Sequence, residues 1–185
     1  MEVSVVTILS IPPDVMVNIF GYLQSVDVLR SKRVSRWWLR CVQKYIKEGV
    51  INLYECHKIT DEGLRYLKGI HTLNLHGCKQ ITDEGLQHLK GVHTIYLYGC
   101  DKITNEGLQH LKGVHTINLS WCKQITDGGL RHLKGVHTIN FSWCGQITNE
   151  GLRHLGGVRT IDLSWCDKIT EDGLKYLTGV VKIIK

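Results

Sequence analysis

The chain has 185 residues, of which 22% are charged and 43% are hydrophobic, an ordinary balance for a globular protein. Its net charge of +6 is only mildly basic, and a nucleic-acid binder would need that charge gathered on one face. No apolar run approaches the roughly 20 residues that span a bilayer, and Glu2 stands where a secretory signal would carry positive charge. We therefore expect a protein of the cytoplasm and/or the nucleus, with neither nucleic acid nor a membrane among its partners.

Both prolines of the chain lie in its first fifty residues, which contain no repeat. After Pro12, apolar residues over 15–23 recur with the spacing of one helical face, and Asp14 suits the first turn of such a helix. Ser25 and Ser35 are placed to cap two further helices. Three helices in about 40 residues bury too little surface to be stable alone. Their apolar excess suggests that a helix of a partner completes the core.

From residue 51 onward, one 22-residue phrase recurs in six copies, with glycine and cysteine at fixed positions. A fixed period of this length is typical of stacked-repeat proteins. In the copy over 113–134, alternation around Ile117 predicts a short strand with one buried face. Leucines three residues apart, at 130 and 133, predict a short helix that Thr126 caps and Gly135 ends. Such a stack offers an extended binding surface and is rarely a catalyst.

Six of the seven cysteines fall at one inward position of the repeat, and Cys41 lies alone upstream. Neighbouring strands about 4.8 Å apart would let thiols approach one another. We nevertheless favour buried free thiols over disulfides, because the chain has no secretory signal. Histidines form two further columns: His71, His93, His115 and His137; and His88, His110, His132 and His154. These columns do not converge with the cysteines as zinc would require, so we expect no metal and no other cofactor.

The outward strand positions are mostly threonine, asparagine and serine. The aromatic exceptions are Tyr96, Tyr98, Trp121, Trp143 and Trp165. The three tryptophans follow one another at the ends of successive strands, where they could pack on one another or anchor a partner. We predict that a target protein docks across the strand ends with these five aromatic residues as anchors.

The spacing of Val136, Ile139, Phe141, Cys144 and Ile147 resembles the cysteine-containing subtype of leucine-rich repeat. The resemblance implies an α/β solenoid over 49–185, with parallel strands on the concave face and short helices on the convex face. Its C-terminal end, at residues 183–185, looks uncapped or truncated within the next strand.

Residues 8–48 resemble the F-box, because the pairs Ile11-Pro12, Asp14-Val15 and Ile19-Phe20, and then Leu23, Asp27-Val28 and the run from Val34 to Trp38, match its pattern in order. The resemblance implies a three-helix domain that binds a Skp-family adaptor. The residues it assigns to this contact are Ile11, Pro12, Val15, Ile19, Phe20, Leu23, Val28, Leu29, Val34 and Trp38.

F-box proteins with C-terminal leucine-rich repeats are similar in plan to this chain. The similarity implies the substrate-recognition subunit of a Skp–cullin–F-box type ubiquitin ligase, with an unknown protein as target. Such a subunit positions its target and is not itself an enzyme, and no nucleophile–base pair is suggested here. One alternative is a leucine-rich repeat scaffold without ubiquitin ligase function. A nucleic-acid binder that uses the basic residues around the third helix is another.

Overall fold

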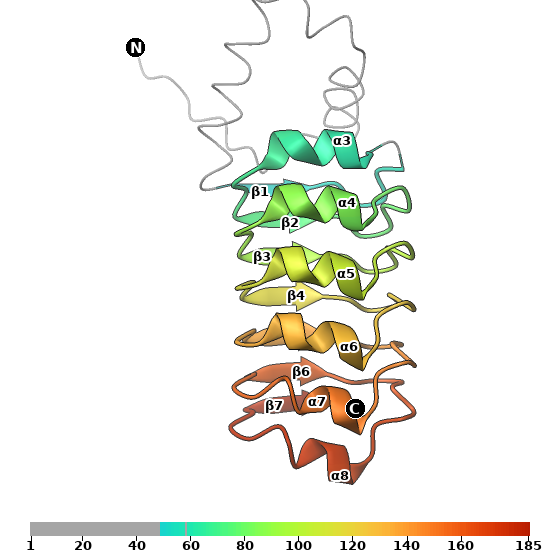
Figure 1. Ribbon diagram of the computed structural model, residues 1–185, viewed down its shortest axis with the longest axis vertical. Helices are drawn as coiled ribbons and strands as arrows, with labels where there is room; N and C mark the ends of the chain where they lie inside the picture. The colour runs from blue at the N-terminus through green and yellow to red at the C-terminus, as the bar shows by residue number, and fades with distance from the viewer. Residues whose placement is uncertain (1–48, 58) are drawn as a thin grey trace, which may run out of the picture.

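The computed structural model describes residues 49–57 and 59–185, which form a solenoid of stacked strand–helix units (Figure 1). Its strands form one parallel sheet in chain order. They are β1 Val50–Asn52, β2 Thr72–Asn74, β3 Thr94–Tyr96, β4 Thr116–Asn118, β5 Thr138–Asn140, β6 Thr160–Asp162 and β7 Lys182–Ile184. The six copies had indicated six rungs, and that count was wrong for the described residues. The five complete copies over 69–178 and one incomplete copy at each end each contribute a strand, which gives seven.

The register of the sheet stacks equivalent positions of the copies directly on one another. Ile95 of β3 pairs with Ile117 of β4, and Tyr96 pairs with Asn118. The middle residue of each strand from β1 to β6 is buried, whereas its neighbours are more exposed. The predicted inward and outward positions are therefore confirmed, and every repeat position becomes a column along the solenoid.

The helices are α3 Asp61–Leu64, α4 Asp83–Leu86, α5 Asn105–Leu108, α6 Asp127–Leu130, α7 Asn149–Leu152 and α8 Glu171–Leu174. Four of them continue into a 3-10 turn: η2 Arg65–Leu67, η3 Gln87–Leu89, η4 Gln109–Leu111 and η5 Arg131–Leu133. Figure 1 shows the helices as a column on one side of the sheet. Thr126 precedes α6 with extended backbone, and Gly135 follows η5 at a φ of 87°. The short helix and its limits match the sequence prediction, but the predicted capping bond was wrong, because the Thr126 side chain makes none among the described residues.

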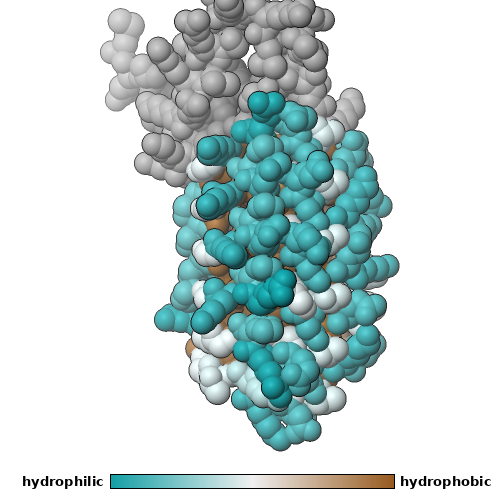
Figure 2. Space-filling model, viewed as in Figure 1, coloured by the Kyte–Doolittle hydropathy of each residue, from teal (hydrophilic) through white to brown (hydrophobic). Residues whose placement is uncertain are grey.

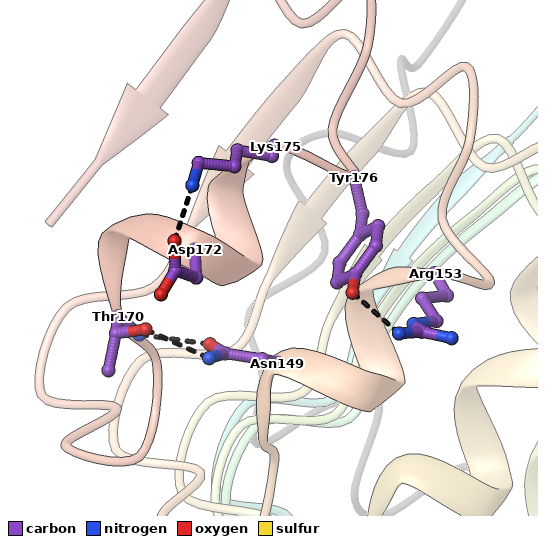
Figure 3. Close-up of polar contacts among 6 residues, drawn as sticks. All are labelled: Asn149, Arg153, Thr170, Asp172, Lys175 and Tyr176. Atoms are coloured by element: carbon purple, nitrogen blue, oxygen red, sulfur yellow. Dashed lines mark hydrogen bonds and ion pairs between the residues drawn. The ribbon is translucent and has the colours of Figure 1, made fainter.

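Polar contacts join the start of each helix from α3 to α7 to the next copy. Asn149 Oδ1 accepts from the backbone N–H of Thr170 at 2.9 Å, and its Nδ2 donates to the Thr170 hydroxyl at 2.8 Å (Figure 3). Figure 3 also shows Arg153 donating to the hydroxyl of Tyr176, 2.6 Å away. These contacts tie α7 to the copy that contains α8.

Isoleucine, leucine and cysteine columns fill a continuous core between sheet and helices. Each fully buried aliphatic side chain contributes roughly 1.5–3 kcal/mol of transfer free energy. The helix side of the solenoid is largely hydrophilic, with hydrophobic residues visible only in small areas between hydrophilic ones (Figure 2). Each copy therefore buries its apolar face against its neighbours, as stacked repeats must.

The cysteine column consists of buried free thiols, as the sequence predicted. Each thiol from Cys78 to Cys166 donates to a backbone carbonyl of the preceding copy; for Cys122 the acceptor is Leu97 O at 3.1 Å. Burial raises the pKa of Cys78, Cys100 and Cys144 to about 12. The column therefore serves structure by satisfying loop carbonyls inside the core.

The F-box-like region and its ten assigned adaptor-binding residues lie outside the described residues. Within 49–57 and 59–185, none of the helices is long and apolar enough to cross a membrane.

Candidate protein-binding surface

The residue before each cysteine has left-handed backbone. Its φ is 52° at Glu55, 70° at Gly77, 65° at Gly99, 62° at Trp121, 64° at Trp143 and 61° at Trp165. Glycine adopts this conformation freely, whereas a bulky residue is held there at roughly 1–3 kcal/mol. Three copies nevertheless place tryptophan where glycine suffices in two others. Strain of this kind clusters at ligand-binding positions, so the tryptophans are candidates for a binding role.

The local sequence explains how the loop reaches this conformation. The side-chain oxygen of Asn118 accepts from the backbone N–H of Ser120 at 2.9 Å, and Asn140 holds Ser142 in the same way at 2.8 Å. Such an Asx turn ends the strand and turns the chain toward the left-handed residue. The backbone N–H of Trp121 then donates to Ser142 O of the next copy at 3.0 Å. The indole is therefore presented from a fixed backbone.

The three indoles form a stack that becomes more exposed toward the C-terminal end. Ring centroids are 5.1 Å apart for Trp121 and Trp143, and 4.7 Å apart for Trp143 and Trp165. Trp121 is half-buried, whereas Trp143 is 43% exposed and Trp165 is 64% exposed. The ammonium of Lys123 lies over the Trp121 ring, 5.2 Å from its centroid. Large exposed rings with fixed backbone are suited to protein recognition.

A second stack occupies the preceding copies, one residue earlier in the repeat. Tyr54, His76 and Tyr98 have successive ring centroids 4.3 and 4.2 Å apart. In the column of this stack Tyr98 is followed by Ser120, and in the indole column Trp121 is preceded by Gly99. The repeat position of the stacked rings therefore changes by one residue between the copy of β3 and the copy of β4.

A hollow of about 540 Å³ lies at this shift. His76, Gly77, Tyr98, Gly99 and Trp121 line it, together with the charged residues Glu55, Lys79, Asp101 and Lys123 and with His57. A Cβ atom added at Gly99 would meet nothing within 4 Å, so the space beside this residue is open. The hollow brings Tyr98 and Trp121 together at one site.

The structure thus divides the five predicted target-binding residues. Trp121, Trp143 and Trp165 stack at the strand ends, and Tyr98 meets Trp121 at the hollow. Tyr96 points outward from β3, is 38% exposed, and joins neither stack among the described residues. Their role as anchors stays a prediction.

Sequence reasoning missed the hollow and the stack of Tyr54, His76 and Tyr98. The available signal was the alignment of Gly77 and Gly99 with the three tryptophans. Glycine at an aligned position indicates positive φ, and its missing side chain indicates space.

The histidine column near the starts of the strands is a separate feature. Rings of His71, His93, His115 and His137 stack with centroids 4.5, 4.5 and 4.2 Å apart. Burial lowers the pKa of His115, and His137, His93 and Arg159 lower it further by charge repulsion. Across the described part of the chain, histidine, cysteine and carboxylate side chains form no group that could hold a metal ion.

Comparisons with known proteins agree with this architecture. The F-box-like family model matches residues 8–45, and a leucine-rich repeat model matches residues 70–90, 114–134, 136–156 and 158–177. A comparison with curated protein sequences gives no significant match. The matched repeat segments pass over residues 91–113, the copy with Tyr96 and Tyr98.

Two solved structures are similar in fold. A chain in the complex of Rad7 and Elc1 from yeast is 17% identical, with a TM-score of 0.58 over 71% of this chain and 38% of that chain. The leucine-rich repeat-containing protein LegL7 from Legionella pneumophila is 13% identical, with a TM-score of 0.51 over 72% of this chain and 53% of that chain. The chain thus spans well under half of the first and about half of the second.

The fold defines a leucine-rich repeat solenoid, and its repeated cysteines are consistent with the cysteine-containing subtype. An F-box-like segment at residues 8–45 precedes these leucine-rich repeats. Domains of these two kinds are typically interaction modules and not catalysts.

Proposed function

We propose that this chain is the substrate-recognition subunit of a Skp–cullin–F-box type ubiquitin ligase. The observation that supports this most strongly is the order of its modules, an F-box-like segment at 8–45 followed by a solenoid. In this role the first module binds a Skp-family adaptor and, through it, the cullin complex. The second module holds a target protein in the cytoplasm and/or the nucleus. The chain then supplies proximity and makes no bond itself.

The aromatic residues at the strand ends support a target-binding role for the repeats. Most of the remaining outward surface carries small polar groups, which give little energy once desolvated. Interface energy usually concentrates in a few Trp, Tyr and Arg residues. The target therefore docks across the strand ends, with Trp121, Trp143 and Trp165 as anchors and Tyr96 and Tyr98 beside them.

The adaptor contact is tested with the full chain and a purified Skp-family adaptor by isothermal titration calorimetry. The variant Pro12→Ala/Leu23→Asp should abolish binding, because it alters two residues that the F-box resemblance assigns to the interface. Thermal unfolding of the repeats should be unchanged. An adaptor affinity equal to that of the parent chain would contradict the assignment.

Ubiquitin transfer separates the receptor from a scaffold. Affinity purification of the intact chain with mass spectrometry supplies candidate targets, and a reconstituted adaptor–cullin ligase then tests each one. We expect transfer to the target to require both modules. A target that binds without receiving ubiquitin would favour the leucine-rich repeat scaffold without ligase function.

A further inference from the structure

The stack of indoles ends at Trp121. In the preceding copies, the stacked rings stand one residue earlier in the repeat. Trp143 covers one face of Trp121, at a centroid distance of 5.1 Å. At the position equivalent to Trp121 in the preceding copy stands Gly99, with open space around its Cβ position. Tyr98 occupies the neighbouring column and stacks on His76. The hollow of about 540 Å³ is therefore a gap in a ladder of rings.

We propose that this gap receives an aromatic side chain of the target protein, which stacks on Trp121 and extends the indole ladder by one rung. The inference rests on the proposed function, in which the repeats bind a target. It adds the chemistry that the site recognises.

The chain itself shows which group suits the gap. Trp121, Trp143 and Trp165 occupy this same repeat position in three successive copies, with ring centroids about 5 Å apart. The left-handed backbone at Gly99, with a φ of 65°, matches the φ of 62° at Trp121. A ring held above Gly99 would continue the stack of the three indoles by one copy. Tyr98 adds a second aromatic wall.

The charges around the gap favour a neutral occupant. Lys79 and Lys123 contribute two positive charges to its lining, and Glu55 and Asp101 contribute two negative ones. A cationic side chain would meet the lysines, and Lys123 already places an ammonium over Trp121. A strongly anionic ligand would meet the two carboxylates. A neutral ring satisfies the stacking surface without upsetting this balance.

The copy that contains the gap departs from the other copies in a further respect. Tyr96 stands at the repeat position of Asn74 and Asn118. The side-chain oxygens of those asparagines accept a hydrogen bond from the backbone N–H two residues later, and a phenol ring has no carboxamide to make that bond. Tyr96 and Tyr98 therefore put two exposed or half-buried rings on the same copy as the gap. This concentration of aromatic surface is suited to a binding hot spot.

N-acetyl-L-tryptophanamide, titrated into the full chain and followed by saturation-transfer NMR, is the probe that tests the proposal. Gly99→Trp fills the gap with the chain's own ring on a backbone already in the required conformation, and should weaken probe binding at least about fivefold. Gly156→Trp is the matched control, because Gly156 also has open space around its Cβ position. This control should leave probe binding unchanged.

Trp121→Gly, which removes the stacking surface at a position where glycine is favoured, should weaken probe binding in the same way if Gly99→Trp fails to fold. N-acetyl-L-leucinamide should bind more weakly than the tryptophan probe to the parent chain. Equal binding of the two probes, or unchanged probe binding in both Gly99→Trp and Trp121→Gly, would overturn the proposal that the gap binds an aromatic side chain. Adaptor affinity does not depend on these outcomes, so a failed adaptor titration would refute the proposed function separately.

Discussion

Gly107 of α5 lies directly against Asp83 of the preceding copy, and a Cβ atom at this position would clash with the Asp83 Oδ1 atom. The Asp83 carboxylate accepts two hydrogen bonds from Thr104, from the backbone N–H at 2.8 Å and from the hydroxyl at 2.6 Å. A glycine at this repeat position thus allows the acid to tie two copies together.

We expect Gly107→Ala to lower the free energy of unfolding by about 1–3 kcal/mol, because the added methyl group displaces the Asp83 carboxylate. Urea unfolding measures the change, with Gly156→Ala as a control at an open position. Combined with Asp83→Ala, the glycine substitution should cost less than it does alone, since the clash is gone. Additive effects of the two substitutions would contradict the contact.

The left-handed backbone of the tryptophans predicts that a glycine substitution is less destabilising than an alanine substitution. Trp165 has a φ of 61° and stacks on Trp143. Trp165→Gly and Trp165→Ala lose the same stacking, but only glycine relaxes in the left-handed region. The glycine variant should therefore be more stable than the alanine variant by about 1 kcal/mol. Chemical denaturation of the two variants tests this, and a more stable alanine variant would refute left-handed backbone at residue 165.

Thiol labelling tests the cysteine column. Because burial raises the pKa of Cys78, Cys100 and Cys144 to about 12, these thiols carry almost no thiolate at pH 8. In a Cys41→Ser background, iodoacetamide should modify the native chain only as fast as the solenoid opens. Labelling in urea should be rapid by comparison. Fast labelling of the folded chain would place the cysteine column at the surface.

The histidine column predicts a loss of stability at mildly acidic pH. The pKa of His115 is lowered below its ordinary 6.5, mainly by burial and then by His137, His93 and Arg159. Between the lowered pKa and 6.5 the unfolded chain binds more protons than the folded chain, so stability rises with pH in this window. The contribution is complete above pH 6.5 and is lost as the pH falls through the folded pKa.

Thermal unfolding from pH 7.5 down to pH 5 measures this loss. His115→Gln should show a shallower decline of the melting temperature than the parent chain. A parallel decline in both proteins would assign the pH dependence to other groups.

Much of the solenoid could be predicted because the repeat fixes it at every copy. The inward register of Ile117, the start of α6 directly after Thr126 and the turn at Gly135 follow from a period of 22 residues and simple turn chemistry. The seventh strand was missed because β1 and β7 belong to incomplete copies.

The details of the site depend on contacts between copies, which a repeat pattern does not specify. The Asp83 carboxylate accepts from the Thr104 hydroxyl, which leaves the oxygen of that hydroxyl free to accept from the backbone N–H of Glu106. The amide of Asn105 instead donates to the Thr126 hydroxyl. Thr126 then makes no capping bond within the described residues. The gap at Gly99 likewise depends on the directions of rings in neighbouring copies.

The proposed function requires that one chain hold an adaptor and a target together. Size-exclusion chromatography with light scattering tests this directly, using the full chain, a Skp-family adaptor and the target recovered with the intact chain. We predict a ternary complex, from which Trp121→Ala/Trp143→Ala loses only the target and Pro12→Ala/Leu23→Asp loses only the adaptor. Thr116→Ala/Thr138→Ala should keep both. Mutually exclusive binding, or greater loss of target from the threonine pair than from the tryptophan pair, would contradict the proposed function.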